Sequence, residues 1–183
     1  MEFENGSIIW RKKFDSPIFA SPQKIPETNE IILAEVTNKV HCLDYLGNIK
    51  WTIETGGNIF SSFEFLVKEN NEILILFGCH SKKVICLLYN KGNVKIDWEV
   101  ELQSQIYATP KLLRTKNQDF IVCCSTNGYL NLINLETRNI EGTFKLPGEI
   151  FSSPAVFQDA AKHSKIFVGC RDNFLYCFNF EHL

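Results

Sequence analysis

The chain has 183 residues, of which 45% are hydrophobic, and its 19 basic and 21 acidic side chains give a formal net charge of −2. This length and apolar content are enough for a hydrophobic core and do not indicate disorder. The charges are spread along the chain without a basic stripe, so we do not expect nucleic acid as a partner. The apolar runs fall far short of the roughly 20 residues of a membrane span, and no basic start leads into an apolar signal segment. We therefore expect a cytoplasmic protein without membrane contact.

A five-residue phrase recurs four times and consists of an isoleucine, an aromatic residue, two small residues and, in three copies, a proline. The copies occupy residues 18–22, 59–63, 106–110 and 150–154, so the steps between their isoleucines are 41, 47 and 44 residues. This period is typical of a blade-type β repeat rather than of a solenoid of short helices. We predict that each phrase begins the inner strand of a blade.

The predicted elements follow one order along the chain. An outer strand at residues 6–10 comes first, and after each phrase two apolar strands are joined by a polar turn. These strand pairs are expected at residues 31–34 and 40–43, 74–78 and 84–87, 120–124 and 130–133, and 166–169 and 175–178. Their turns contain residues that tolerate the positive φ angles of tight hairpins, namely Thr37-Asn38, Ser81-Lys82, Asn127-Gly128 and Asp172-Asn173.

A fourth strand follows each of the first three hairpins. It begins with glycine and ends with tryptophan at residues 47–51 and 92–98, and the opening segment 6–10 shares that pattern. The copy at residues 138–142 lacks both features, and Gly142 stands in the position of the tryptophan. The chain should therefore contain a lone outer strand, three units of four strands, and a last unit of three strands that ends near Phe180.

Such units repeat radially in a β-propeller, so we predict an all-β chain of four-stranded antiparallel blades. Residues 1–183 would form one propeller segment, with repeats at about 6–46, 47–91, 92–137 and 138–183. The opening strand could complete the last blade and close a ring of four. We favour the alternative, in which the four blades are part of a larger propeller.

The repeat resembles the pyrroloquinoline-quinone-type, or quinoprotein-like, propeller repeat, with Asp44, Gly47 and Trp51 among the matching positions. WD40 repeats agree less well, because no Gly-His and Trp-Asp pair recurs. We assign structural roles in the repeat to Trp10, Trp51, Trp98, Pro22, Pro110, Pro154, Gly47, Gly78 and Gly169.

Seven cysteines without any C-x-x-C spacing predict neither a disulfide framework nor a metal site, and they favour a reducing compartment. Cys123-Cys124 resembles the vicinal pair that flanks the quinone in some quinoprotein dehydrogenases. The pair lies in a predicted core strand, where successive side chains face opposite ways, so we expect two buried thiols instead.

Other candidate site residues also favour structural roles. The histidines have no ligand spacing, and we expect surface residues at His41, His80, His163 and His182. The aromatic residues of the phrase, Phe19, Phe60, Tyr107 and Phe151, should belong to the core or to the packing between blades rather than to a stacking platform. Hydroxyls at Ser21, Ser62, Thr109 and Ser153 have no recurring base, so they should tie loop backbone. We predict no catalytic, cofactor-binding or metal-binding residue.

Among cytosolic, cysteine-rich proteins with this repeat, the chain resembles the carboxy-terminal propeller of β-alanine-activating enzymes in the acyl-CoA synthetase family. The resemblance implies a parent that uses ATP to activate a carboxylate and loads it on a phosphopantetheine carrier. Neither cofactor should bind to this chain, because it has no phosphate-binding loop and no carrier serine. We expect a non-catalytic segment whose partners are other domains of the parent, its acyl substrate or another protein.

Two alternatives stay open. A quinone-dependent dehydrogenase would hold pyrroloquinoline quinone and calcium, although this chain has no D-x-D-x-D-G calcium loop. A sensor or chaperone-type propeller of the secretory route is disfavoured by seven cysteines without a pairing pattern.

Overall fold

The computed structural model describes residues 6–158 and 164–180, and every regular element in these ranges is a strand. The strands form four antiparallel sheets, each ordered as in the sequence. The first sheet contains β1 (Gln23–Lys24), β2 (Glu30–Ala34), β3 (Lys39–Asp44) and β4 (Ile49–Glu54). The second contains β5 (Glu64–Val67), β6 (Ile73–Gly78), β7 (Lys83–Asn90) and β8 (Asn93–Glu101). The third contains β9 (Lys111–Arg114), β10 (Asp119–Ser125), β11 (Tyr129–Asn134) and β12 (Ile140–Lys145), and the last contains β13 (Ala155–Gln158), β14 (Ser164–Gly169) and β15 (Leu175–Phe180).

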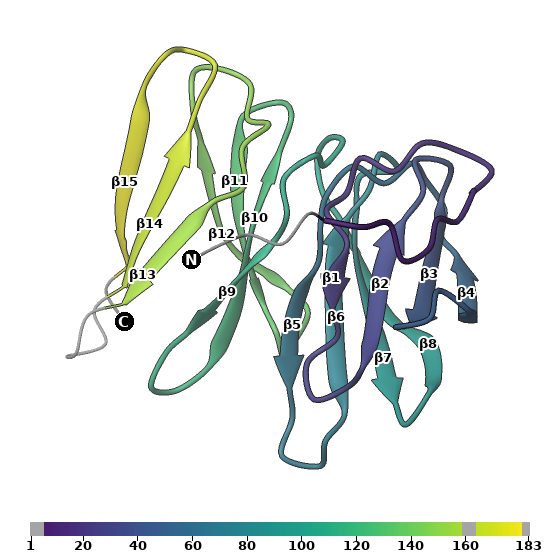
Figure 1. The fold of residues 1–183 in the computed structure, drawn as a ribbon. Coiled ribbons are helices and arrows are strands. Elements are labelled where there is room, and N and C mark those ends of the chain that lie inside the picture. The colour runs from purple at the N-terminus through teal and green to yellow at the C-terminus, as the bar shows by residue number, and fades with distance from the viewer. Residues whose placement is uncertain (1–5, 159–163, 181–183) are drawn as a thin grey trace.

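The sheets are arranged as the blades of a propeller, which confirms the predicted fold class. The first strands lie beside one another in chain order (Figure 1), and β9 contacts both β5 and β13. The fourth strands β4, β8 and β12 occupy the opposite edges of their sheets. Within the described ranges no helix is long and apolar enough to cross a membrane.

The turns between the second and third strands have the predicted conformations. The φ angles are 75° at Asn38, 67° at Lys82, 89° at Gly128 and 72° at Asn173. These left-handed residues reverse the chain so that each second strand pairs with the third in an unbroken antiparallel register.

The core lies between the sheets, so the central strands β6 and β10 are buried on both faces. In β6, Ile75 and Phe77 pack toward the first sheet, whereas Leu74 and Leu76 pack toward the third. All six residues of β6 are buried, which explains its continuous apolar sequence.

The vicinal cysteines confirm this alternation. Cys123 packs between the second and third sheets, and Cys124 packs between the third and last sheets. Both thiols are free and fully buried, as predicted.

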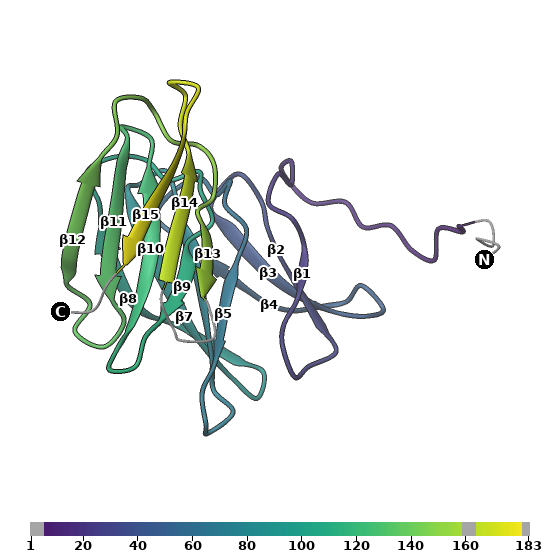
Figure 2. The same ribbon diagram turned by 90° about the vertical axis from the view of Figure 1, so that its left-hand side faces the viewer.

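The opening segment differs from its prediction. Residues 6–10 form no strand, and Ile8 and Ile9 are 83% and 90% exposed. Trp10 lies instead against Gly47, a residue with a φ of 86°, and its Nε1 donates a hydrogen bond to the Tyr45 carbonyl over 3.0 Å. Figure 2 shows the reason, because the segment projects away from the sheets and lies well apart from β15. Within residues 6–158 and 164–180 the four blades therefore form an open arc, and residues 6–10 do not complete the last sheet.

The other residues of the repeat lie at strand boundaries. Three prolines immediately precede first strands, and two glycines end second strands; these are Pro22, Pro110, Pro154, Gly78 and Gly169. Trp51 and Trp98 belong to the fourth strands β4 and β8. Their structural roles stay predictions, which the next substitution begins to test.

Gly78→Ala should destabilise the fold by about 1–3 kcal/mol, because overpacking a filled core forces side chains and backbone to move. A Cβ at Gly78 would lie 2.1 Å from Cγ2 of Ile106, whose side chain is fully buried. Urea unfolding followed by tryptophan fluorescence measures the loss. Gly56→Ala is the control, because its added Cβ would meet nothing closer than 3.9 Å. Equal stability of the two variants would contradict close packing at Gly78.

Candidate functional site

Every phrase is held to the second-strand turn of its own blade by one backbone hydrogen bond. In each blade the donor is a backbone N–H in the turn that follows the second strand. The acceptor is the carbonyl of the residue just before the isoleucine of the phrase. The four bonds are Val36 to Pro17 at 3.0 Å, His80 to Asn58 at 2.8 Å, Thr126 to Gln105 at 2.8 Å and Arg171 to Glu149 at 2.9 Å. Because the bond is equivalent in all four blades, all four phrases lie on the same face of the arc, beside the turns between second and third strands.

A second set of hydrogen bonds joins the blades to one another through the fourth residue of each phrase. The N–H of Ser21 donates to Oγ of Ser62, the N–H of Ser62 donates to Oγ1 of Thr109, and the N–H of Thr109 donates to Oγ of Ser153. Each distance is 2.9 Å. The prediction that these hydroxyls tie loop backbone is confirmed for Ser62, Thr109 and Ser153, and the structure adds that the bonds join neighbouring blades. Ser21 takes part through its backbone N–H. We call this chain of bonds the hydroxyl relay.

The aromatic residues of the phrases form a continuous row across the four blades. Ring centroids are 5.7 Å apart between Phe19 and Phe60, 5.0 Å between Phe60 and Tyr107, and 5.0 Å between Tyr107 and Phe151. These spacings are those of favourable aromatic pairs, so the predicted packing between blades is confirmed.

The aromatic row packs between the blades and is not part of the core, the other placement that the sequence left open. Phe19 is 67% exposed and Phe151 is 39% exposed, while Phe60 and Tyr107 are half-buried. The three ring contacts are tilted, stacked and T-shaped in turn, and part of each ring stays at the surface. The aromatic row is therefore an accessible apolar strip that crosses all four blades on the face that carries the phrases.

Two side chains from the turns extend the aromatic row. His80 lies between Phe60 and Tyr107, with centroid distances of 4.5 and 4.3 Å, and Arg171 lies over Phe151 at 5.6 Å. Burial lowers the pKa of His80, which favours its neutral ring in this stack. Nε2 of His80 is buried without a hydrogen-bond partner among the described residues.

Sequence reasoning missed the roles of His80 and Arg171. Both stand two residues beyond the glycine that ends the second strand, at Gly78 and Gly169, so alignment of the repeats placed them in one column. Their chemistry was not apparent because the other two members of that column are Val36 and Thr126.

His41 corrects another expectation, because it is buried rather than at the surface. Its Nε2 lies 2.7 Å from Oε1 of Glu35, and its Nδ1 lies 2.8 Å from Oγ1 of Thr52. Glu35 also accepts the N–H of Ser16 over 2.6 Å, which fastens the segment before the first phrase to the first sheet. His163 and His182 lie outside the described residues.

No group of three histidine, cysteine or acidic residues in residues 6–158 and 164–180 could hold a metal ion. Burial raises the pKa of the Cys42, Cys86 and Cys124 thiols to about 12, so they remain protonated and unreactive. What the arrangement offers is a fixed, partly exposed aromatic surface.

Comparison with known proteins places this architecture in a family. Residues 1–180 match the family model described as the β-propeller of the β-alanine-activating enzyme. The chain belongs to this family. A β-alanine-activating enzyme from Drosophila melanogaster is 38% identical over 186 residues, a match that covers 94% of this chain and 18% of the fly protein. The human enzyme is 33% identical over 110 residues, covering 58% of this chain and 9% of the human protein.

Solved structures show the same fold at low sequence identity. BamB from Moraxella catarrhalis superposes with a TM-score of 0.69 at 15% identity, covering 94% of this chain and 50% of BamB. The WD40 β-propeller domain of Doa1 superposes with a TM-score of 0.70 at 16% identity, covering 93% and 53%. This member of the β-alanine-activating enzyme propeller family thus spans about half of the propellers that it matches, and a small part of its curated relatives.

Thr109→Val tests the hydroxyl relay. Valine keeps the shape of threonine but removes the acceptor of the Ser62 N–H, and an unsatisfied amide near the core should cost about 1–3 kcal/mol of stability. Thr109→Ser keeps the hydroxyl and should unfold at nearly the parental urea concentration. A valine variant as stable as the serine variant would show that the bond between the blades contributes nothing.

Stability should also depend on the ionisation of Glu35. Burial alone would raise the pKa of this carboxyl, but hydrogen bonds from His41 and Ser16 outweigh it and hold the pKa below its usual 4.5. A lowered pKa in the folded state stabilises the fold above pH 4.5, and this contribution is lost as the pH falls through the lowered value. In urea titrations at several pH values, Glu35→Gln should lose less stability on acidification than the parent. Glu54→Gln is the control, because Glu54 is exposed. Parallel curves of stability against pH for the parent and Glu35→Gln would contradict the expectation.

Proposed function

We propose that the chain is a non-catalytic docking module of a larger, ATP-dependent β-alanine-activating enzyme that carries its acyl intermediate on phosphopantetheine. Membership of the propeller family supports this parent, as does the length of the fly relative, of which the chain matches 18%. In this proposal, ATP and phosphopantetheine bind to other domains of the enzyme. The seven free cysteines support a reducing, cytoplasmic setting.

The aromatic row is the observation that carries the docking role. Aromatic side chains provide large contact areas at low cost in conformational entropy, and they are enriched in the residues that dominate binding energy. Here the rings are fixed in advance, because each ring contacts its neighbour and the phrases are joined by the hydroxyl relay. A partner therefore does not have to order this surface when it binds.

The occupant that we propose for the aromatic row is an apolar segment of the activating or carrier domains, brought to it with the acyl arm. Phe19 and Phe151 leave the most ring surface accessible and would be its main contacts. Arg171 pairs with Glu149 at 2.7 Å, so a charged rim bounds the row at Phe151. Apolar centres with polar rims are the usual composition of protein interfaces.

The double substitution Phe19→Ser and Phe151→Ser should weaken docking at least about tenfold, since each ring at the centre of an interface is commonly worth more than about 1 kcal/mol. Isothermal titration calorimetry would measure binding of this chain to a family enzyme made without its own propeller. Phe157→Ser is the matched control, because Phe157 is 57% exposed but lies in β13, outside the aromatic row. Unchanged affinity of the double variant, or no binding by the parental chain, would overturn the proposal.

Two further measurements on the purified chain test the non-catalytic assignment. A saturable rise in melting temperature with pyrroloquinoline quinone and calcium would instead support the quinone-dependent dehydrogenase, because a ligand that binds only the native state must stabilise it. Release of pyrophosphate from ATP and β-alanine by the chain alone would also overturn it.

A further inference from the structure

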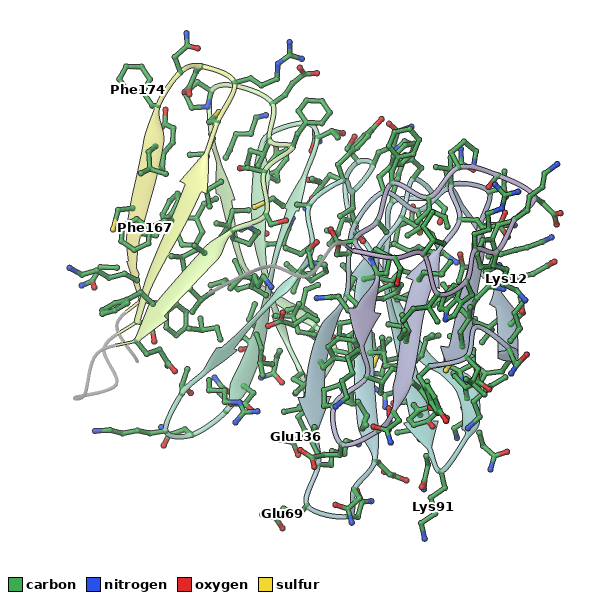
Figure 3. The ribbon with its side chains drawn as sticks, in the orientation of Figure 1. Lys12, Glu69, Lys91, Glu136, Phe167 and Phe174 are labelled. Atoms are coloured by element: carbon green, nitrogen blue, oxygen red, sulfur yellow. The ribbon has the colours of Figure 1, made fainter. Side chains whose placement is uncertain are left out.

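A groove between the second and third sheets opens on the face opposite the phrases. Its volume is 510 Å³, which is within the range of small-molecule binding sites. One wall comes from the β5–β6 loop, β6 and β8, and the other comes from the β9–β10 loop, β10 and the β11–β12 turn. Figure 3 shows Glu69 and Glu136, from loops on this face, toward the lower end of the sheets, and Phe174, beside a turn on the phrase face, at the upper end. Both sheets also pack against a neighbour on their other side, so the groove is formed entirely within the chain.

The floor of the groove is apolar. Leu74 and Trp98 line it and are only 3% and 7% exposed, and the half-buried Leu135 adds to the same surface. The indole N–H of Trp98 has no acceptor among the described residues, although a buried indole usually finds one. The floor therefore offers a ligand an aromatic ring and an unused hydrogen-bond donor.

Six charged side chains line the groove around this floor, and their charges sum to zero. Three are basic and three are acidic, namely Lys68, Lys116 and Arg138, and Asp97, Asp119 and Glu136. Nη2 of Arg138 lies 3.9 Å from Oδ2 of Asp97, which is too far for a hydrogen bond. Within the described ranges, Lys116, Asp119 and Glu136 form no ion pair and no hydrogen bond through their side chains. The groove thus presents both signs of charge with most of their hydrogen-bonding capacity unused.

Arg138 occupies a position that glycine fills in the first two blades. The residue that begins the segment of the fourth strand is Gly47 in the first blade and Gly92 in the second, with φ angles of 86° and 87°. Arg138 has a φ of 64° at the same position, a left-handed conformation that is uncommon for a residue with a long side chain. Residues held in this conformation are concentrated at functional sites. Because glycine would form this turn with less strain, the arginine indicates a role for its side chain, which lies near Asp97 of the neighbouring blade.

The wall from the third sheet is held by Asn134, which is 2% exposed. Nδ2 of Asn134 donates to Oε1 of Gln118 over 3.0 Å, and Oδ1 accepts the N–H groups of Glu136 and Thr137 over 2.9 Å. The N–H of Arg138 donates to the carbonyl of Asn134, also over 2.9 Å. One buried amide side chain therefore joins the β9–β10 loop to the β11–β12 turn, and a ligand does not have to order this wall when it binds.

We propose that this groove binds a small zwitterion, an amino acid that places its carboxylate on Arg138 and its ammonium on Asp97. A ligand with a single charge would pair with half of the charged side chains and lie close to the like charges of the other half, which opposes binding. A ligand that carries both charges pairs with both halves. Arginine can hold a carboxylate through two parallel hydrogen bonds, and an indole ring attracts a cation placed over its face.

This site goes beyond the proposed docking function, because it lies on the face opposite the aromatic row and takes a small molecule. Only the choice of β-alanine as the probe rests on the proposed function, in which a larger enzyme activates that amino acid. β-Alanine has an ammonium, a carboxylate and two methylene groups between them. It therefore offers a partner to the acidic side chains, to the basic side chains and to the apolar floor.

Titration of the purified chain with β-alanine tests the site. The Nε1–H resonance of Trp98, assigned with a Trp98→Phe variant, should shift saturably in two-dimensional proton–nitrogen NMR spectra. Propionate lacks the ammonium and propylamine lacks the carboxylate, so neither should cause a saturable shift at the same concentration and ionic strength. The absence of a saturable shift with β-alanine, or an equal shift with either analogue, would overturn the proposal.

Arg138→Gly separates binding from stability. The variant should bind β-alanine at least about tenfold more weakly, because the charged hydrogen bonds to the carboxylate are lost. Its melting temperature should be unchanged or higher, since glycine adopts the left-handed conformation without strain. Lys91→Gly is the matched control, because Lys91 is also basic, has a φ of 48° and lies outside the groove. Parental affinity of Arg138→Gly, or an equal loss in Lys91→Gly, would contradict the proposed site.

Asp97→Asn provides a second variant that keeps the shape of the side chain. It removes the charge that pairs with the ammonium, so it should also weaken β-alanine binding at least about tenfold, and parental affinity would refute the proposal. Calorimetry with a family enzyme made without its own propeller distinguishes this site from the aromatic row. A chain that docks but does not bind β-alanine refutes the groove alone, and a chain that binds β-alanine but does not dock refutes the aromatic row alone.

Discussion

A hydrogen bond from one phrase to the next determines how the blades are spaced. The amide of the fourth phrase residue donates to the hydroxyl of the equivalent residue in the following blade, over 2.9 Å in all three junctions. The bond joins equivalent atoms each time, so neighbouring phrases meet in the same way at all three junctions. The aromatic residues two positions earlier in each phrase accordingly lie with ring centroids 5.0–5.7 Å apart, above sheets that pack through their apolar faces.

Residue identity can vary elsewhere in the repeat because neighbouring residues compensate. Phe63 replaces the proline of the second phrase, but it is fully buried and packs edge-on against Phe77, with ring centroids 5.6 Å apart. In the first two blades a small cysteine on the third strand faces a tryptophan on the fourth. In the third blade the sizes are exchanged, because Leu132 faces Gly142 and fills the space beside it. The hydroxyl has no such substitute, and every copy of the phrase keeps serine or threonine at that position.

The hairpins could be predicted from sequence because their determinants are local. Apolar strands and turn residues such as Asn38 and Asn173 need only their neighbours to fold. The relay joins residues that are 41–47 positions apart in the sequence, and Phe19 packs on Phe60 of the next blade. His41 is buried by polar contacts with Glu35 and Thr52 of its own blade, which a pattern of apolar residues does not reveal. Residues 6–10 show the same limit, since a strand-like sequence forms a strand only where an edge is available to pair with it.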